Sequence, residues 1–544
     1  MVTGGLLLPL VYWPQAFHTY WAPKAAVGLV LVTPGLVALC HLIAARSRAA
    51  ALAGAFLAWA TLSTLLSDNV VLSLVGEPNW GIGLLFLALL VGAWALGACA
   101  GEARRHQLLM ALVVAGVANA AVAWLQARQL VPPALESPVP GRAGGLVGNP
   151  VHLGALCAGA LWLMGRRLGR ERGSLWWLVA VAVVAGASEL SGGRSAVALS
   201  LLAVVFTLPA AGIRRALAVA AAVGVGMVVA PLGAEDAVRG SGRAVGAESI
   251  THVDARLGLW RAGGEALMER PLVGWGPARF EAATTPRYTR TIAIDGSISW
   301  TDAHNWVVHH AVTTGLVGLG LLCAWLAAAG RASGGPLVGF ALVVAASMLV
   351  EPQSVALTPL ALLALGASSR RAPPGTTAGK GWRLVTVAGL VVGALGGAIL
   401  LAGEVFLERG FTDASPPSYR RAEALLPPWP EVTLIGARVE AYHGLSPEGL
   451  AHRRRALALA REATRRDPAD AASWAYLGAL ELRWGREEKA AAALGRAMER
   501  NPWSPLALRA KLDLAERRRD DAGAAESCDR LRRLGRAPPP CTRR

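Results

Sequence analysis

The stretch GAEDAVRGSGRAVGAESITHVDARLGLWRAGGEALMERPLVGWGPARFEAATTPRYTRTIAIDGSISWTDAHN, residues 233–305, decides how the rest of the chain is interpreted. It is the longest polar interruption in the strongly apolar sequence that runs to about residue 403. Hydrophobic runs precede and follow it, so we interpret it as a large loop outside a membrane that connects two spanning helices. Within this loop we expect a short helix that begins at Asp254 and ends before Pro271.

The composition of the chain is that of a membrane protein. Of its 544 residues, 54% are hydrophobic, and the mean hydropathy is +0.44. Apolar runs of about 20 residues are long enough to cross a hydrocarbon core of about 30 Å. The formal net charge of +17 would suggest a nucleic-acid partner in a soluble protein. Here much of that charge lies in short loops between apolar runs, and we find no nucleic-acid-binding motif, so we expect no nucleic-acid partner.

The apolar runs predict an all-α fold, a polytopic bundle of about 12–13 transmembrane helices. Each span must be helical because unpaired backbone groups are costly in lipid. The expected spans are residues 4–18, 24–42, 50–66, 80–99, 108–126, 151–164, 175–187, 195–208, 216–229, 306–328, 337–350, 354–367 and 384–402.

The charges of the loops predict which loops share a side of the membrane. Alternate loops are rich in arginine, and these are expected in the cytoplasm: Arg46 and Arg48; Arg104 and Arg105; Arg166, Arg167, Arg170 and Arg172; Arg214 and Arg215; Arg331; Arg370, Arg371 and Lys380. The intervening short loops carry only Lys24, Arg128, Arg142 and Arg194. Because positive loops remain on the cytoplasmic side, residues 233–305 and everything after Ala402 are expected outside.

The sequence after Ala402 predicts a separate helical region. We expect a transmembrane domain at 1–403, a Pro-rich connector at 404–436, helical repeats at 437–535 and a disordered tail at 536–544. Ala456, Ala490 and Ala524 recur every 34 residues, and the middle repeat resembles the tetratricopeptide pattern of paired helices. Such an array either packs as an appendage or docks a protein partner. Cys528 and Cys541 can pair if this end lies outside the cytoplasm.

Two outward-facing turns carry candidate ligand-binding residues. The first, PGRAGGLVGNP (140–150), contains Arg142 and Asn149, and the next helix begins at its final proline, where free N–H groups favour an anion. The second, ELSGGRS (189–195), places Arg194 at a helix start. A lone cation at membrane depth costs roughly 2.5–3.5 kcal/mol, so Arg194 needs a partner such as Glu189 or a bound anion.

The large loop supplies two further candidates. Arg256 and Arg261 lie on the expected helix about 140° apart, so one can face a cavity while the other faces water. His304 and Asn305 stand at the end of the loop, at the outer mouth of the next span. Histidine is the side chain best suited to proton transfer near neutral pH. Arginine suits the oxygens of a phosphate, so the set favours a lipid pyrophosphate as ligand, and no metal-ligand pattern accompanies it.

These motifs, taken in order, resemble the O-antigen ligase and polymerase superfamily of bacterial membrane proteins. The matching stretches are GEPNWG (76–81), GRAGGLVGNP (141–150), SGGR (191–194), Arg256 with Trp260, PLVGWG (271–276), AHN (303–305) and GLVG (315–318).

The resemblance implies a multi-pass glycosyltransferase of the bacterial inner membrane. Its donor would be a glycan on a polyprenyl-pyrophosphate carrier, and its acceptor a hydroxyl group of lipid A-core, of another glycan or of a protein, on the periplasmic face. It implies catalytic roles for Arg194 and Arg256 at the pyrophosphate and for His304 as the base, with Arg142, Arg261, Asn149 and Asn305 as substrate-binding residues. It also implies that no metal and no nucleotide sugar are needed, and we expect no cofactor.

Several interpretations of the function remain open. Within the enzyme class these are a ligase, a repeat-unit polymerase and a protein O-oligosaccharyltransferase. Outside it, a transporter of lipid-linked sugars would show paired halves with internal symmetry, which the sequence lacks. An envelope scaffold would depend on the repeats rather than on Arg194.

Overall fold

The computed structural model describes residues 2–78, 82–168, 175–205, 213–232, 234, 247–294, 300–370, 380–446, 448–536 and 541. The expected cytoplasmic Arg170, Arg172 and Arg371, the last residues of the GEPNWG motif, and parts of the large loop therefore lie outside the described residues. The described chain is all-α: it is built from helices, with one isolated β-bridge between Ser333 and Ser369. The expected fold class is thus confirmed.

Five helices are long and apolar enough to cross a membrane: α2 (Ala22–Ala44), α3 (Arg48–Leu65), α6 (Glu102–Gln126), α16 (Trp306–Arg331) and α19 (Lys380–Thr412). Shorter apolar helices lie beside them: α5 (Leu84–Ala98), α8 (Leu175–Leu190), α9 (Arg194–Val205), α11 (Ile213–Val229), α17 (Pro336–Ser347) and α18 (Leu357–Ala367). The bundle also contains α1 (Val2–Leu10), α4 (Val70–Val75) and α7 (Pro150–Leu168). The chain is therefore a multi-pass membrane protein, but α1 has only nine residues and is too short to cross alone, unlike the expected span over 4–18.

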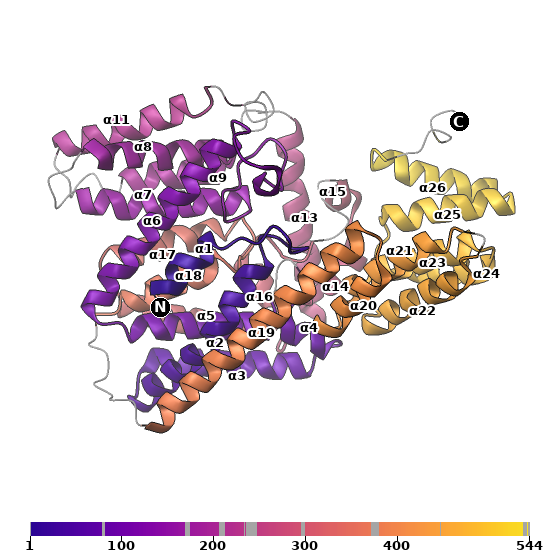
Figure 1. Ribbon diagram of the computed structural model, residues 1–544, viewed down its shortest axis with the longest axis horizontal. Coiled ribbons are helices and arrows are strands. Elements are labelled where there is room, and N and C mark those ends of the chain that lie inside the picture. Colours follow the sequence, from indigo (N-terminus) through magenta and orange to yellow (C-terminus); the bar gives the residue numbers. More distant parts are fainter. Residues whose placement is uncertain are drawn as a thin grey trace.

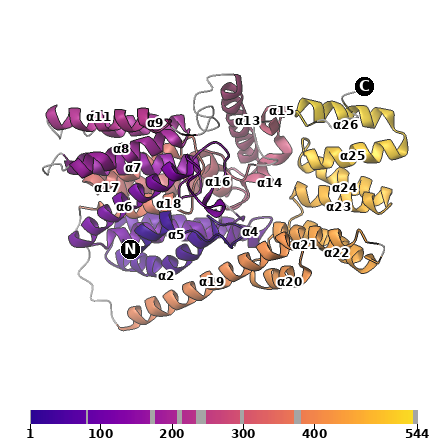
Figure 2. The same cartoon turned by 45° about the horizontal axis from the view of Figure 1, so that its top comes forward.

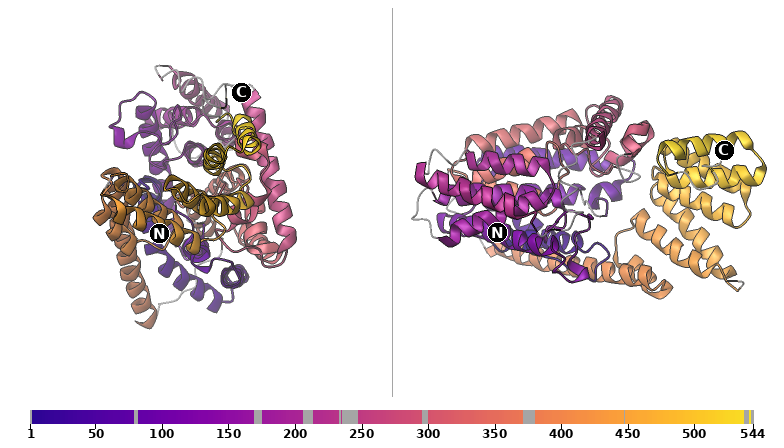
Figure 3. Two further views of the ribbon diagram at one scale, coloured as in Figure 1. Left: turned by 90° about the vertical axis from the view of Figure 1, so that its right-hand side faces the viewer. Right: turned by 90° about the horizontal axis from the view of Figure 1, so that it is seen from above.

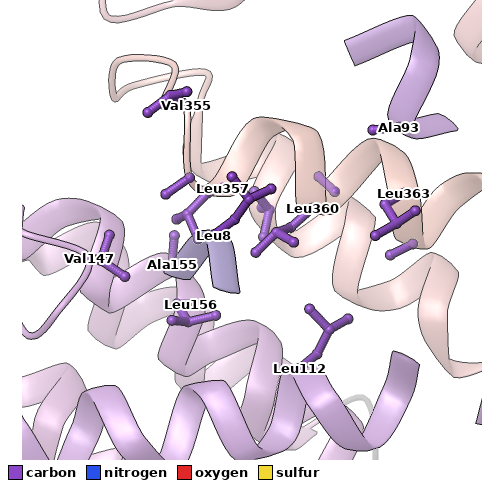
Figure 4. Packing of buried hydrophobic residues seen from close by; sticks show 14 of the residues in the cluster. Leu8, Ala93, Leu112, Val147, Ala155, Leu156, Val355, Leu357, Leu360 and Leu363 are labelled. Carbon is purple, nitrogen blue, oxygen red and sulfur yellow. The ribbon is translucent and has the colours of Figure 1, made fainter. Parts of the chain in front are cut away.

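The core of the bundle is assembled from helices that are distant in sequence. In Figure 4, Leu8 of α1 lies among Leu357 and Leu360 of α18 and close to Ala155 of α7, and all of these side chains are buried. Burying a leucine side chain stabilises a fold by about 1.5–3 kcal/mol where water is the alternative. The short α1 therefore packs inside the core, between α7 and α18.

The arginine-bearing loops that the structure describes meet at one end of the bundle. One cavity is lined by Arg48 at the start of α3, Ala98 at the end of α5, Arg331 at the end of α16 and Arg370 after α18. Trp162 near the end of α7 donates to the backbone oxygen of Pro336 at the start of α17. The large loop and the C-terminal helices lie at the opposite end (Figures 1 and 3).

α16 is interrupted where the large loop meets it. Gly315 has φ 70° and ψ 178°, so its backbone leaves the helix. The turn at 271–276 pairs with the freed groups: Trp275 N–H donates to Val312 O, Gly276 N–H to Thr313 O, and Leu316 N–H to Pro271 O. Irregular backbone inside a membrane bundle needs such internal partners. This pairing fixes the large loop to the bundle.

The large loop is mostly helical where it is described. It contains α13 (Ala247–Glu269), α14 (Phe280–Thr284) and α15 (Arg290–Ile294), and the 3-10 turn η2 (Thr285–Arg287) lies between α14 and α15. A second 3-10 turn, η1 (Pro133–Leu135), lies in the earlier loop between α6 and α7. The expected helix around Asp254 is thus present and ends before Pro271, although it begins earlier than Asp254.

The C-terminal region consists of successive antiparallel helices. They are α20 (Pro416–Leu425), α21 (Pro430–His443), α22 (Leu450–Arg466), α23 (Ala471–Arg483), α24 (Glu487–Arg500), α25 (Pro505–Arg518) and α26 (Asp521–Arg533). Residues 404–436, expected as a Pro-rich connector, are largely helical, because α19 continues to Thr412 and α20 and α21 follow at once. Cys528 and Cys541 form a disulfide.

The C-terminal helices stack against the large loop, as Figure 2 shows. Trp503 contributes to the small core of α13 and α14, and Arg290 donates to the backbone oxygen of Arg533. Asn69, after α3, donates to the backbone oxygen of Arg466 at the end of α22. The repeats are therefore on the same side of the bundle as the large loop.

Candidate functional site

The glycine-rich turn at 140–150 is held in place by three polar side chains from the bundle. Lys24 is buried and its Nζ donates to the backbone oxygens of Val11, Tyr20 and Leu146. Asn119 accepts from Val147 N–H, and Gln126 accepts from the N–H groups of the two glycines at 144 and 145. These anchors fix the turn that carries Arg142.

Arg142 lies across the second glycine-rich turn. Its Nε donates to Ser191 O at 2.8 Å. Gly192 has φ 63°, and a Cβ there would stand 3.1 Å from Arg142 Nε, so glycine makes room for the guanidinium. Burial lowers the pKa of Arg142; the negative charge of Glu351 opposes this, while the positive charge of Arg256 adds to it.

Glu351 connects three of the elements at this point. It is buried in the turn between α17 and α18. Arg256 Nη2, from α13, lies 3.4 Å from Glu351 Oε2, and Ser195 Oγ, from α9, donates to Glu351 Oε1 at 3.2 Å. Burial raises the pKa of Glu351, and Arg256, Ser195 and Arg142 counteract that rise. A single carboxylate therefore faces the two guanidinium groups and the start of α9.

His304 lies near the same arginine and has a defined ring orientation. Its Nδ1 is 3.2 Å from Asp302 O, and its own N–H donates to Asp302 Oδ1 at 2.6 Å. Because a carbonyl oxygen only accepts, Nδ1 carries the hydrogen, and in the neutral ring the lone pair is on Nε2. The ring of Trp300 meets His304 edge to face, with centroids 4.7 Å apart. Burial and the positive charge of Arg256 lower the pKa of His304 to about 3, although the bond to Asp302 raises it in part.

Asp302 joins His304 to the first turns of α16. Its Oδ2 lies 3.3 Å from His309 Nδ1, and both side chains are buried. Burial raises the pKa of Asp302 to about 7, while hydrogen bonds from His304 and Gln353 hold it lower than burial alone would. His309 stacks on Phe280, and His310 Nε2 lies 3.3 Å from Gln353 Oε1. The adjacent histidines thus point to different neighbours.

The structure brings Arg142, Arg256 and His304 of the sequence-predicted set together. Arg194, next to Ser195, is exposed at the start of α9 and lines a cavity of about 320 Å³ with Glu189 and the two glycines at 192 and 193. Arg261 points away: its side chain is 85% exposed and pairs with Glu265 on the surface of α13.

The two asparagines serve as local structural groups. Asn149 Oδ1 accepts from Val151 N–H at the start of α7, and Asn305 Oδ1 accepts from the N–H groups of Val307 and Val308 and caps α16. Such caps satisfy donors at the first turn of a helix. Both residues therefore position the ends of helices that border the site.

Sequence reasoning missed Glu351 and Ser195. A signal was present, since Glu351 is a lone carboxylate between two apolar runs, and intramembrane acids mark functional sites. Among the residues that the structure describes, no group of three or more His, Cys, Asp or Glu side chains is placed to hold a metal ion.

Comparison with known proteins gives one informative match. None of the curated proteins matches the chain. Six solved chains match. One of them belongs to the crystal structure of the APC/C hetero-tetramer Cut9–Hcn1, with 10% identity, 87% of this chain and 78% of that chain covered, and a TM-score of 0.23, too low to carry an argument.

The model of the O-antigen ligase family matches residues 177–323. This region runs from α8 into α16 and contains Arg194, Ser195, Arg256 and His304, whereas Arg142 and Glu351 lie outside it. Residues 177–323 of this multi-pass membrane chain therefore resemble the O-antigen ligase family, which supports the resemblance to the ligase and polymerase superfamily.

Proposed function

We propose that the chain transfers a glycan from a polyprenyl-pyrophosphate carrier to a hydroxyl acceptor on the periplasmic face of the bacterial inner membrane. The observation that carries the proposal is the position of Arg256. This residue contacts Glu351, and its positive charge also lowers the pKa of His304. A cation that binds the leaving group thus lies beside a side chain that can take up the proton of the attacking group.

The leaving group of this reaction gains negative charge, and the arginines supply the matching positive charge. Arg256 and Arg142 face the same buried carboxylate. Planar guanidinium groups fit phosphate oxygens in paired hydrogen bonds. We assign Arg256 and Arg142 to the pyrophosphate and Arg194, at the mouth of the neighbouring cavity, to a supporting role. Arg261 is left out because it pairs with Glu265 at the surface.

His304 is the proposed base. Asp302 holds its Nδ1, which directs the Nε2 lone pair toward an acceptor. In the transfer, the acceptor oxygen bonds to the anomeric carbon, the bond from that carbon to the pyrophosphate oxygen breaks, and the hydroxyl proton passes to Nε2. The polyprenyl pyrophosphate leaves with the electron pair. Direct displacement of this kind inverts the anomeric centre.

Two features support the proposed orientation. The described arginine-rich loops gather at the end of the bundle opposite the large loop, which is the cytoplasmic end under the positive-inside rule. The C-terminal helices carry a disulfide, which persists in an oxidising compartment. We propose that 437–535 is a periplasmic repeat domain that docks a protein partner or the acceptor.

The test is a matched pair of substitutions on one helix, assayed with purified protein and a polyprenyl-pyrophosphate glycan. Arg256→Ala is expected to reduce transfer by about 10²–10³-fold, the loss seen when one preorganised donor to a developing anion is removed. Arg261→Ala, five residues along α13, is expected to leave transfer within about two-fold, as is usual for an exposed ion pair. Equal effects of the two substitutions would contradict the assignment.

His304→Ala and Arg142→Ala extend the test. Both are expected to reduce transfer, and donor binding should weaken in Arg142→Ala but persist in His304→Ala, because only the arginine contacts the pyrophosphate. The chemical identity of the product, after incubation with lipid A-core, free glycan or protein, separates a ligase from a polymerase and from a protein O-oligosaccharyltransferase. Movement of intact donor across the bilayer without transfer would favour a transporter.

A further inference from the structure

A second cavity lies at the end of the bundle opposite the candidate site. Its volume is about 980 Å³, at the upper end of the range for ligand sites. It is bounded by the start of α3, the ends of α5 and α16, and the turns that follow α16 and α18. Nothing in the proposed reaction uses it.

Three arginines line this cavity. Arg48 begins α3, Arg331 ends α16, and Arg370 follows α18. All three side chains are exposed, and none forms an ion pair with a residue that the structure describes. Among the described residues that line the cavity, none is acidic. Three cations collected around one space without a counter-charge favour a bound anion.

The arginine-bearing turns are joined to one another. Arg370 N–H donates to Ala332 O, and Gly334 N–H donates to Ser368 O. Ser333 Oγ donates to Ala329 O at 2.7 Å. These bonds join the two turns that carry Arg331 and Arg370, so the backbone holds both residues beside the same cavity.

The remaining lining is apolar and small. It includes Ala324, Ala327 and Ala328 on one side of α16, with Leu42 at the end of α2 and Leu52 on α3. A free phosphate would satisfy the arginines but leave these walls uncovered. An acyl chain would cover them, because burying apolar surface is favourable and lipid tails already surround the bundle.

We infer that this cavity binds the headgroup of an anionic phospholipid from the cytoplasmic leaflet, with Arg48, Arg331 and Arg370 on the phosphate and an acyl chain along the alanine face of α16. Basic pockets between transmembrane helices on the cytoplasmic side suit such headgroups. The inference rests on the cavity and on the proposed orientation of the bundle, and it is independent of the proposed transfer reaction.

The test measures lipid binding to the purified full chain by native mass spectrometry, with phosphatidylglycerol as the probe. Each arginine near a membrane surface contributes enough attraction that its removal should weaken binding about five-fold. Arg331→Ala and Arg370→Ala should each show this loss, and the triple substitution with Arg48→Ala about a hundred-fold loss. Arg104→Ala is the matched control, because Arg104 is an exposed arginine at the start of α6 that does not line the cavity.

Three outcomes would overturn the inference. The first is equal weakening by Arg104→Ala, which would mean that net charge alone attracts the lipid. The second is equal binding of phosphatidylcholine, which would mean that the anion is irrelevant. The third is displacement of phosphatidylglycerol by inorganic phosphate at similar concentration, which would mean that the site recognises a free anion and not a lipid.

Discussion

Arg279 of the large loop makes two hydrogen bonds to Asp467 of the repeats: Nη1 lies 2.8 Å from Oδ2 and Nη2 lies 3.0 Å from Oδ1. The same guanidinium makes two more to Asp68, after α3, at 2.8 and 3.0 Å. Arg279 is 1% exposed. The two carboxylates raise its pKa above the ordinary value in spite of burial. One side chain thus joins the bundle, the large loop and the repeats.

Arg279→Ala is expected to lower the free energy of unfolding by about 3–5 kcal/mol, because it leaves Asp467 buried without a countercharge. Thermal unfolding of the purified chain and proteolysis between the bundle and the repeats measure the effect. Arg290→Ala removes only the single bond to Arg533 O and should cost about 1 kcal/mol or less. If the two variants lose the same free energy of unfolding, Arg279 does not hold the bundle, the large loop and the repeats together.

Glu351→Gln tests whether this carboxylate competes with the donor for Arg256. Glutamine keeps the shape and can still accept from Ser195, but it removes the negative charge that faces the arginines. The KM for the donor is expected to fall about ten-fold, which corresponds to about 1.4 kcal/mol. A KM that rises instead would mean that Glu351 is needed to orient Arg256.

The pH dependence of transfer should depend on Asp302. Its pKa of about 7 means that it ionises as the pH rises from about 6 to 8. A negative charge bonded to the His304 backbone makes the imidazole a stronger base, so kcat/KM is expected to rise through this range. Because the folded state binds this proton more tightly than the unfolded state, unfolding becomes easier as the pH rises toward 7. In Asp302→Asn, the pH dependence of kcat/KM and that of the free energy of unfolding should both flatten. An unchanged inflection of kcat/KM near pH 7 would assign the titration to another group.

Two glycines of α16 give a test of the helix break. A Cβ at residue 315, where φ is 70°, would stand 2.1 Å from Leu272 O, whereas nothing lies within 4 Å of a Cβ at residue 320. Gly315→Ala is expected to destabilise the chain by about 1–3 kcal/mol or more and to displace the turn at 271–276. Gly320→Ala should be neutral. Equal melting temperatures for the two variants would show that the break is not required.

The helices of the bundle could be predicted because long apolar runs are local signals. Most expected spans match a helix to within a few residues. Arg142, Arg256 and His304, which the structure brings together, could be proposed from the sequence because short motifs surround them. Glu351 was not found, because its contact with Ser195 joins residues 156 positions apart and no local pattern encodes such a pairing.

The region after Ala402 shows two limits of local reasoning. Glu404 marked the end of an apolar run, yet it is buried inside α19, where His18 donates its N–H to Oε2 at 2.8 Å. A distant partner thus lets a charged residue continue a helix. Three prolines of the expected connector, Pro416, Pro417 and Pro430, stand in the first turns of α20 and α21, where proline lacks only an N–H that no helical bond needs. These three prolines therefore mark the starts of helices.

α19 has 33 residues, a length of about 50 Å at 1.5 Å per residue, against a hydrocarbon core of about 30 Å. The part of α19 after the expected span at 384–402, residues 403–412, therefore adds about 15 Å of continuous helix that leads directly into α20. The length of this end of α19 determines the distance between the repeats and the membrane. An insertion of four residues above Glu404 would lift and turn them by about one helical turn, and a docked partner would be carried with them.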